Sequence, residues 1–300
     1  MSKNNSNDWT INKILSWTEF YFKDHSIDSP RLTAQMLLAH SLGIKRLDLY
    51  LQYDRPLQKN ELSDFKVLIK RRIQNEPAAY IIGEKGFFES NFKVAGDVLI
   101  PRPDTETIVE EALKILNIGK DSGSPKTVLE LGTGSGAIIV SLAKAAPGHL
   151  YFASDISVRA LAIAKKNAEK IVPKIISDKI CFCAGDWFSS LRKTSRFDLI
   201  VSNPPYIPTS DIQTLQPEIK QFEPMLALDG GRDGLACLRS ILDGAHRHLV
   251  PEGMLLLEMG FDQKEEIRNI SNRYPQYQSI EFIRDLAGHN RVVLIKKSID

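Results

Sequence analysis

A glycine-rich turn near the middle of the chain could hold a nucleotide-like ligand. The segment Glu130-Leu131-Gly132-Thr133-Gly134-Ser135-Gly136-Ala137 joins an apolar strand-like run to a helical one. Its glycines let the backbone pass close to a ligand, and the free N–H groups at the helix start face whatever is bound. Asp155 ends the next strand-like run, where an acidic side chain would hold ribose hydroxyls. A nicotinamide dinucleotide and S-adenosylmethionine both fit this pattern.

A second segment, Asn203-Pro204-Pro205-Tyr206, ends the fourth predicted strand. Ligands of open α/β sheets bind at this carboxyl edge. The two prolines remove two N–H donors and leave outward carbonyls, so the segment is stiff and rich in acceptors. The Asn203 side-chain oxygen and the Pro204 carbonyl can accept both hydrogens of a planar NH₂ group, with Tyr206 stacked on it. Hydride transfer has no evident use for such a clamp, although a purely structural Pro-Pro turn is an alternative.

The elements that must position these residues alternate between strand and helix from residue 127 onward. Strands are expected at 128–131, 151–154, 179–184, 197–202, 254–258, 280–283 and 292–296. Helices are expected at 135–146, 158–171, 235–249 and 263–274. This order predicts an α/β fold with a doubly wound, mostly parallel sheet. The last two strands are joined by too few residues for a helical crossover, so they should form an antiparallel hairpin.

The beginning of the chain has a different pattern. Apolar residues recur at helical spacing in 11–22, in 30–42 and in a later helix with Leu62, Phe65, Ile69 and Ile73 on one face. The basic residues Lys66, Lys70, Arg71 and Arg72 are expected toward solvent or a partner. We therefore predict a helical bundle over 1–78, a hairpin-like connector over 79–103 with strand-like runs at 80–82, 86–92 and 93–100, and an α/β domain over 104–300.

Composition restricts the function further. With 39 Lys+Arg against 37 Asp+Glu the formal charge is only +2, so binding driven by nucleic-acid phosphates is not expected. The three cysteines indicate reduced thiols, and Cys181 and Cys183 are expected in the core. The first residues carry no secretory or transit pattern, and no run is long enough for a membrane span. These features predict a soluble, cytoplasmic protein without a metal site.

Together these motifs resemble the N5-glutamine methyltransferases that modify peptide chain release factors. The resemblance covers nearly the whole chain. Besides the glycine turn and Asn203-Pro204-Pro205-Tyr206, it includes the segments 99–106 (Leu-Ile-Pro-Arg-Pro-Asp-Thr-Glu), 154–157, 185–188, 222–224 (Phe-Glu-Pro) and 230–235. Family members often carry Asp where Glu130 stands and Glu where Asp104 stands. Both differences keep the carboxylate.

The resemblance implies a Rossmann-like methyltransferase domain that uses S-adenosylmethionine and releases S-adenosylhomocysteine. Gly132, Thr133, Gly134, Ser135 and Gly136 would surround the methionine and ribose portion, Asp155 would pair with the ribose hydroxyls, and Trp187 would pack near the adenine. Asn203 would contact both cofactor and substrate, and the whole segment Asn203, Pro204, Pro205 and Tyr206 would seat the glutamine amide. Asn203, Pro204 and Tyr206 are the expected catalytic residues, whereas Arg102, Glu223 and Arg232 could simply order their loops.

The substrate implied by this resemblance is the Gly-Gly-Gln glutamine of a class I release factor, held partly by the helical bundle. The alternative enzyme is an adenine-N6 DNA methyltransferase, which shares the Asn-Pro-Pro-Tyr segment but needs base flipping and a basic channel. A non-catalytic binding module is a third possibility, which the intact glycine turn and clamp disfavour. We expect a monomer that binds neither membrane nor nucleic acid directly.

Overall fold

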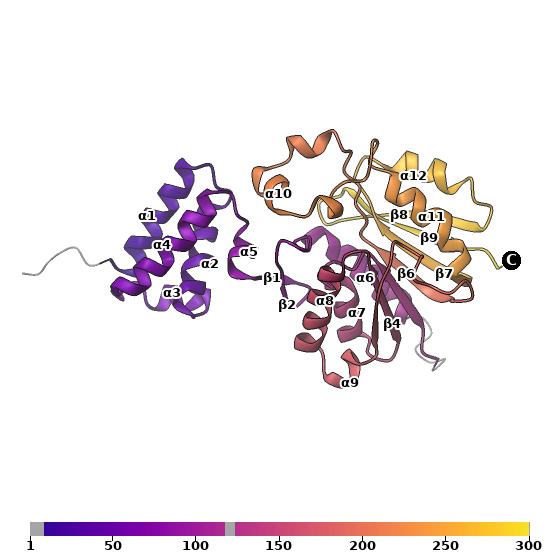
Figure 1. Cartoon of the computed structure of the whole chain (residues 1–300), viewed down its shortest axis with the longest axis horizontal. Coiled ribbons are helices and arrows are strands. Elements are labelled where there is room, and N and C mark those ends of the chain that lie inside the picture. The colour runs from indigo at the N-terminus through magenta and orange to yellow at the C-terminus, as the bar shows by residue number, and fades with distance from the viewer. Residues whose placement is uncertain (1–8, 118–123, 300) are drawn as a thin grey trace, which may run out of the picture. The chain divides into compact units, whose positions relative to one another are not determined.

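The computed structural model describes residues 9–117 and 124–299, and their contacts divide the chain into two units. The helical unit comprises the chain up to Gly83 together with Gln216–Phe222. The sheet unit comprises Glu84–Leu215 and the chain from Glu223 onward. Figure 1 shows helices alone in the first unit and a sheet with helices in the second. Within the described residues, no helix combines the length and apolarity needed to cross a membrane.

The helical unit is built from amphipathic helices around one apolar core. Its elements are α1 (Ile11–Asp24), α2 (Pro30–Leu42), α3 (Arg46–Leu51), α4 (Lys59–Ile73), α5 (Ala78–Ile82) and α10 (Pro217–Phe222). The buried face of α1 is the predicted one, Ile11, Ile14, Leu15, Thr18 and Phe22. Helix α2 begins at Pro30 and ends before Gly43, whose φ of +66° gives a left-handed cap.

Two expectations for this part of the chain are wrong. The strand expected at 80–82 is helical and belongs to α5, because Pro77 starts a single turn that Gly83 ends with a φ of +81°. Arg72 does not face solvent: its side chain is 5% exposed and pairs with Glu218 of α10 at 2.5 Å. The separation of 146 positions between these two partners explains why helical periodicity alone could not reveal the pair.

The sheet unit contains one seven-stranded sheet in the order β5-β4-β3-β6-β7-β9-β8 and a separate hairpin, β1-β2. The strands of the sheet are β3 (Thr127–Leu131), β4 (Leu150–Asp155), β5 (Ile180–Ala184), β6 (Phe197–Ser202), β7 (Leu249–Glu258), β8 (Tyr277–Arg284) and β9 (Asn290–Lys297). The hairpin pairs β1 (Glu84–Phe87) with β2 (Ser90–Lys93), so the strand-like runs expected at 86–92 and 93–100 are wrong: residues 88–89 form the turn of the hairpin, and residues 94–100 form no strand. Strand β9 is antiparallel to both of its neighbours, so the predicted final hairpin is confirmed.

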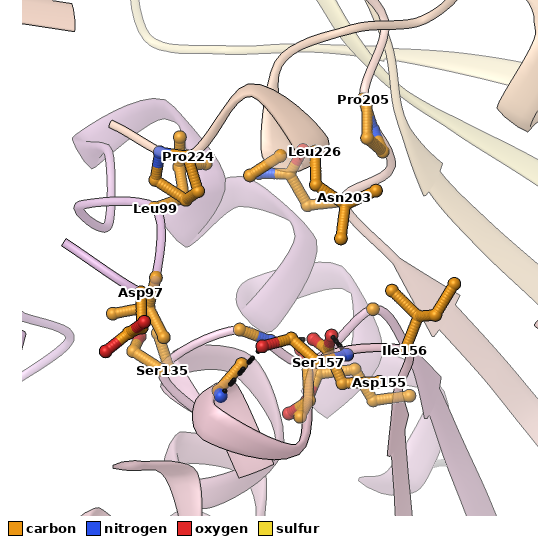
Figure 2. Close-up of a pocket in the computed structure, with 18 of the residues that line it drawn as sticks. Asp97, Leu99, Ser135, Asp155, Ile156, Ser157, Asn203, Pro205, Pro224 and Leu226 are labelled. Atoms are coloured by element: carbon orange, nitrogen blue, oxygen red, sulfur yellow. Dashed lines mark hydrogen bonds between the residues drawn. The ribbon is translucent and has the colours of Figure 1, made fainter. Parts of the chain in front are cut away.

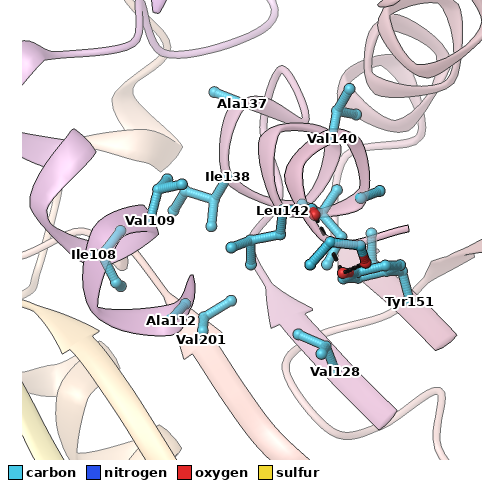
Figure 3. Close-up of a cluster of buried hydrophobic side chains, with 14 of the residues drawn as sticks. Ile108, Val109, Ala112, Val128, Ala137, Ile138, Val140, Leu142, Tyr151 and Val201 are labelled. Atoms are coloured by element: carbon cyan, nitrogen blue, oxygen red, sulfur yellow. Dashed lines mark hydrogen bonds between the residues drawn. The ribbon is translucent and has the colours of Figure 1, made fainter. Parts of the chain in front are cut away.

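Helices cover both faces of the sheet, as the alternating pattern predicted. They are α6 (Glu106–Asn117), α7 (Ala137–Ala145), α8 (Val158–Ile171), α9 (Lys174–Ser177), α11 (Ala236–His248) and α12 (Lys264–Ser271), with short 3-10 turns η1 (Pro103–Thr105), η3 (Asp211–Thr214) and η4 (Met225–Ala227). One apolar core joins α6 and α7 to strands β3 and β6 (Figure 3). A second core joins α11 and α12 to the opposite face. The predicted doubly wound α/β class is therefore confirmed.

Tyr151 shows how a polar atom is accommodated in the first core. The side chain is 1% exposed, and its hydroxyl donates to the carbonyls of Ala146 at 2.6 Å and Leu142 at 3.2 Å (Figure 3). Ala146 directly follows the last residue of α7, and the Leu142 carbonyl also accepts from the Ala146 N–H at 2.8 Å. The phenol therefore closes the helix while its ring fills the core, and burial raises its pKa.

Cys181 and Cys183 are not core residues, contrary to expectation. Strand β5 lies at the edge of the sheet, and Cys181 is exposed while Cys183 is half-buried. An apolar run identifies a strand, but strand order decides how completely its faces are covered.

The register of the parallel strands brings the predicted site residues to one edge. Leu131 of β3 pairs with both Ser154 of β4 and Ser202 of β6, and Ser202 pairs with Leu257 of β7. The residues that follow this row are Gly132, Asp155, Asn203 and Glu258. They therefore leave the sheet together at its carboxyl edge, where ligands of such sheets bind.

Candidate active site

A cavity of about 640 Å³ opens at this carboxyl edge within the sheet unit. Figure 2 shows Asn203, Pro205 and Leu226 along one side and Ser135, Asp155 and Ser157 along the other. The site residues predicted from sequence that line it are Gly132, Thr133, Gly134, Ser135, Asp155, Trp187, Asn203 and Pro205. Gly136, Pro204 and Tyr206 are not part of its lining. The structure thus brings the glycine turn and the start of the Asn-Pro-Pro-Tyr segment to a common space.

The glycine turn has a backbone that other residues adopt with strain. Gly132, Gly134 and Gly136 have φ values of +68°, +54° and +79°. Gly136 also lies against α8, where a Cβ would be 3.1 Å from the Cβ of Ala164. The third glycine therefore sets the approach of two helices, whereas the first two remain at the cavity.

Gly136→Ala is expected to lower the free energy of unfolding by about 1–3 kcal/mol, through left-handed strain and overpacking against Ala164. Urea denaturation measures the change. Gly148→Ala is the matched control, since a Cβ there meets nothing within 4 Å and its φ is not in the left-handed range. Equal stability of the two variants would contradict this role for Gly136.

Asp155 closes the glycine turn. Its Oδ2 accepts from the Gly134 N–H at 2.8 Å and its Oδ1 from the Ser157 N–H at 2.8 Å. Burial raises the pKa of this carboxyl, while the N–H donors of Ser157 and Gly134 oppose the rise. Each carboxylate oxygen retains a second acceptor position, so the group can hold the turn and still bind hydroxyls in the cavity.

Glu130 lies beneath the same turn and is 1% exposed. Its Oε2 accepts from the Thr133 hydroxyl and, at 3.1 Å, from the Ile139 N–H at the start of α7. Burial raises the pKa of Glu130 to about 8, against the opposing effect of these two donors. The carboxyl is therefore neutral over most of the acidic and neutral range and links the turn to the helix.

The raised pKa predicts how Glu130 affects stability. Because the folded chain keeps a proton that the unfolded chain releases near pH 4.5, stability should fall as pH rises from about 4.5 to 8. The slope from one such group approaches 1.4 kcal/mol per pH unit. Glu130→Gln should remove this contribution, so its stability relative to the parent should increase with pH in denaturation series. A constant difference between the two would contradict the prediction.

Trp187 follows β5 and has a φ of +47°, a left-handed conformation that is strained for an aromatic residue. Its ring lies over the glycine turn, since a Cβ on Gly132 would be 3.8 Å from the ring atom Cζ3. The side chain is half-buried and lines the cavity. It thus presents a flat apolar surface beside the turn, which a fully buried core tryptophan would not.

The Asn203 amide is held by a residue far away in sequence. Its Nδ2 donates to the Thr105 hydroxyl at 3.1 Å, which leaves Oδ1 as the other end of the amide. Among the described residues, no donor reaches this Oδ1 or the carbonyl of Pro204. Both acceptors proposed for an NH₂ group therefore have no donor within the part of the chain that the structure describes.

Tyr206 has a buried partner that the sequence did not indicate. Its hydroxyl contacts the Glu258 carboxylate at 3.3 Å, and its ring packs against the second apolar core. Burial and the Glu258 charge raise the pKa of this phenol. The geometry gives Tyr206 a structural partner beneath the cavity, while stacking on a substrate stays a prediction.

The backbone after Tyr206 is fixed by three contacts. The Gln263 Nε2 donates to the Tyr206 carbonyl at 3.0 Å. The Ile207 N–H donates to Leu228 at 3.2 Å, and the Ile207 carbonyl accepts from the Gly230 N–H at 2.8 Å. This segment is therefore rigid before any ligand binds.

Arg102 and Glu223 order the cavity wall through contacts with each other and with the Ile100 backbone. Glu223 is 1% exposed at its side chain, pairs with Arg102 and accepts from the Ile100 N–H at 3.2 Å. Arg102 also lines the cavity. Arg232, in contrast, is exposed and does not line it.

Three buried polar residues near the site were missed from the sequence: Thr105, Asn167 and Glu258. Asn167 of α8 is fully buried, donates to the carbonyls of Lys93 and Ser135, and accepts from the Lys93 N–H at 2.7 Å. It thereby joins the hairpin strand β2 to the glycine turn. A polar residue on the apolar face of a predicted helix was the available signal.

Comparison with known proteins gives consistent results over both units. Residues 13–83 match the model described as PrmC N-terminal domain, and residues 112–232 match the one described as Methyltransferase small domain. A protein named release factor glutamine methyltransferase from Geobacter sulfurreducens is 42% identical over 265 residues, covering 88% of this chain and 89% of its own length. One of the same name from Rhodopirellula baltica is 36% identical over 98% of both chains.

Among solved structures, the catalytic domain of hMettl16 in complex with MAT2A 3′UTR hairpin 6 has a TM-score of 0.54 at 15% identity. The match covers 70% of this chain and 75% of that one. This likeness supports the fold alone.

Proposed function

Because this chain belongs to the family of release factor glutamine methyltransferases, we propose that it methylates the side-chain amide nitrogen of a glutamine in a class I peptide chain release factor. The methyl donor would be S-adenosylmethionine. The glutamine would be that of the Gly-Gly-Gln motif. We place the reaction in the cytoplasm and expect a monomeric enzyme whose helical unit helps to hold the protein substrate.

One observation supports the proposal above the others. The Asn203 Oδ1 and the Pro204 carbonyl belong to adjacent residues and have no donor among the described residues, and Asn203 lines the same cavity as the glycine turn. Two neighbouring acceptors suit a group with two N–H bonds, such as a primary amide. Pro204 is buried away from the lining, so its carbonyl rather than its ring would be the contact.

The cavity also suits the proposed methyl donor. Its lining combines the exposed turn backbone, the Asp155 carboxylate and the Trp187 ring, which fit an amino-acid group, ribose hydroxyls and an adenine respectively. S-adenosylmethionine, when bound, supplies an electrophilic methyl group on a sulfonium. The volume of about 640 Å³ leaves space for a glutamine side chain beside such a ligand.

The residues act mainly by orientation and electrostatics. An amide nitrogen is a weak nucleophile because its lone pair is delocalised into the carbonyl. By accepting hydrogen bonds from both N–H groups, the Asn203 side-chain oxygen and the Pro204 carbonyl would stabilise the positive charge that develops on the nitrogen. They would also orient the nitrogen lone pair. No strong base is required, because the methylated nitrogen is acidic enough to lose a proton to water.

Transfer of labelled methyl from S-adenosylmethionine tests the proposal directly. The acceptors are a purified class I release factor, the same factor with its Gly-Gly-Gln glutamine replaced by alanine, and duplex DNA. Label is expected only on the unaltered factor. Label found only on DNA would favour an adenine-N6 methyltransferase and overturn the proposal.

A further inference from the structure

We propose that Glu258 is a positioning residue, which acts through the Thr105 hydroxyl to hold the Asn203 amide with its oxygen toward the cavity. The inference deepens the proposed function and rests on it for its meaning in catalysis. It concerns Thr105 and Asn203, which line the cavity, and Tyr206 and Glu258, which do not.

Glu258 is a buried carboxyl with incomplete partners. It ends β7 directly beside the strand that leads to Asn203, and it is 1% exposed. Its Oε1 faces the Tyr206 hydroxyl at 3.3 Å, whereas its Oε2 has no hydrogen-bond partner among the described residues. A buried acceptor in this state is costly unless a nearby donor serves it.

We assign the Thr105 hydroxyl as that donor. Its hydroxyl oxygen already accepts from the Asn203 Nδ2 at 3.1 Å, so its own proton must point elsewhere. Burial raises the pKa of the Glu258 carboxyl, and the Thr105 side chain opposes this rise. Thr105 is 4% exposed, so water cannot readily replace either contact.

The ionised Glu258 carboxylate sets the direction of the hydrogen bonds in this relay. An ionised carboxyl can only accept, so it draws the Thr105 proton toward itself and leaves the Thr105 oxygen as an acceptor. Asn203 must then present its NH₂ group to Thr105 and its Oδ1 to the other side. Without the carboxylate, the Thr105 hydroxyl could instead donate to the Oδ1 of a flipped Asn203 amide. The Asn203 NH₂ group would then face the substrate and repel the N–H groups of the substrate amide.

The relay should depend on pH, because it requires Glu258 to be ionised. The pKa of Glu258 is set by burial and by the following neighbours. Burial raises the pKa of Glu258 to about 7, with opposing effects from Thr105, Arg291 of β9 and Tyr206, and a further increase from Asp104. Arg291 itself pairs with Asp104 at 3.1 Å and with Asp285 at 3.2 Å. Glu258 therefore ionises near neutrality, and turnover should rise with pH across that range.

The variants Thr105→Val, Thr105→Ser and Glu258→Gln test the relay. Thr105→Val keeps the shape but removes the hydroxyl, and we expect kcat to fall about 10-fold or more with S-adenosylmethionine affinity within about twofold of the parent. Thr105→Ser should restore most of kcat. Glu258→Gln should lower kcat and abolish its rise near pH 7. Thr18→Val is the matched control, because Thr18 of α1 is equally buried and its hydroxyl has no partner among the described residues.

A second readout needs no release factor. The side-chain ¹⁵N resonance of Asn203, identified by its loss in Asn203→Ala, should shift with a midpoint near pH 7 in the parent and stay constant in Thr105→Val. If the parent fails to methylate a release factor but shows this titration, the proposed function fails and the relay stands. Unchanged kcat and pH profile in both Thr105→Val and Glu258→Gln would overturn the relay. A loss of kcat that is accompanied by a matching fall in melting temperature and in cofactor affinity would also overturn the relay.

Discussion

Asn203→Ala is expected to lower kcat by about 100-fold or more while S-adenosylmethionine affinity changes only a few-fold. The variant removes the Oδ1 acceptor, whose interaction with the amide strengthens as charge develops on nitrogen. It also releases the Thr105 hydroxyl, which loses its donor. The loss therefore falls on the transition state rather than on cofactor binding.

Single-turnover methyl transfer and calorimetric titration with S-adenosylmethionine measure the two quantities separately. Asn12→Ala, on an exposed position of α1, serves as a control for the same change elsewhere in the chain. Cofactor affinity that collapses in step with turnover would count against the assignment of Asn203 to the substrate amide. It would make Asn203 primarily a cofactor ligand.

Asp155→Ala should have the opposite signature, with cofactor affinity reduced first and kcat at saturating S-adenosylmethionine affected less. We expect the dissociation constant to rise about 10-fold to 100-fold, corresponding to the loss of one or two charge-assisted hydrogen bonds. The structure adds a second cause. Without the carboxylate, the Gly134 and Ser157 N–H groups lose their acceptor, so the turn is less well fixed.

Asp155→Asn separates the two causes, since its amide oxygen can still accept one of these N–H bonds. Calorimetry gives the affinity, and urea denaturation shows whether the turn has weakened the fold. An unchanged dissociation constant for Asp155→Ala would remove Asp155 from the ribose role. It would leave the residue as a closure of the glycine turn alone.

Much of the architecture follows from local pattern. The predicted bounds of α8 and β6 agree with the structure to the residue. Helix α8 has a clear start signal, Ser157, whose side chain accepts from the Ala160 N–H at 3.2 Å. Strand β6 is a short apolar run that ends at the Asn-Pro-Pro-Tyr segment. The edge at which Gly132, Asp155 and Asn203 meet was predictable because parallel strands end together.

The support beneath the site was not predictable, because it depends on contacts between distant segments. Asn203 and Thr105 are 98 residues apart, and Tyr206 and Glu258 are 52 apart. In sequence, Glu258 is simply the residue after an apolar run, and Thr105 is one of several candidates to start a helix. Strand order, which local pattern does not encode, places Glu258 beside the strand that leads to Asn203, and Thr105 contacts the Asn203 amide from the turn η1.

Two separate stretches of the chain form the helical unit, because α10 belongs to it. The chain passes between the two units at 83/84, 215/216 and 222/223, so the helical unit is discontinuous in sequence. A fragment that ends at Gly83 would keep the buried Arg72 guanidinium but lack Glu218, its anion. Removing the anion of a pair that stays buried costs about 3–5 kcal/mol, so the fragment is expected either to lose stability or to expose this guanidinium to water. A gene segment that ends at Gly83 therefore does not encode the complete helical unit.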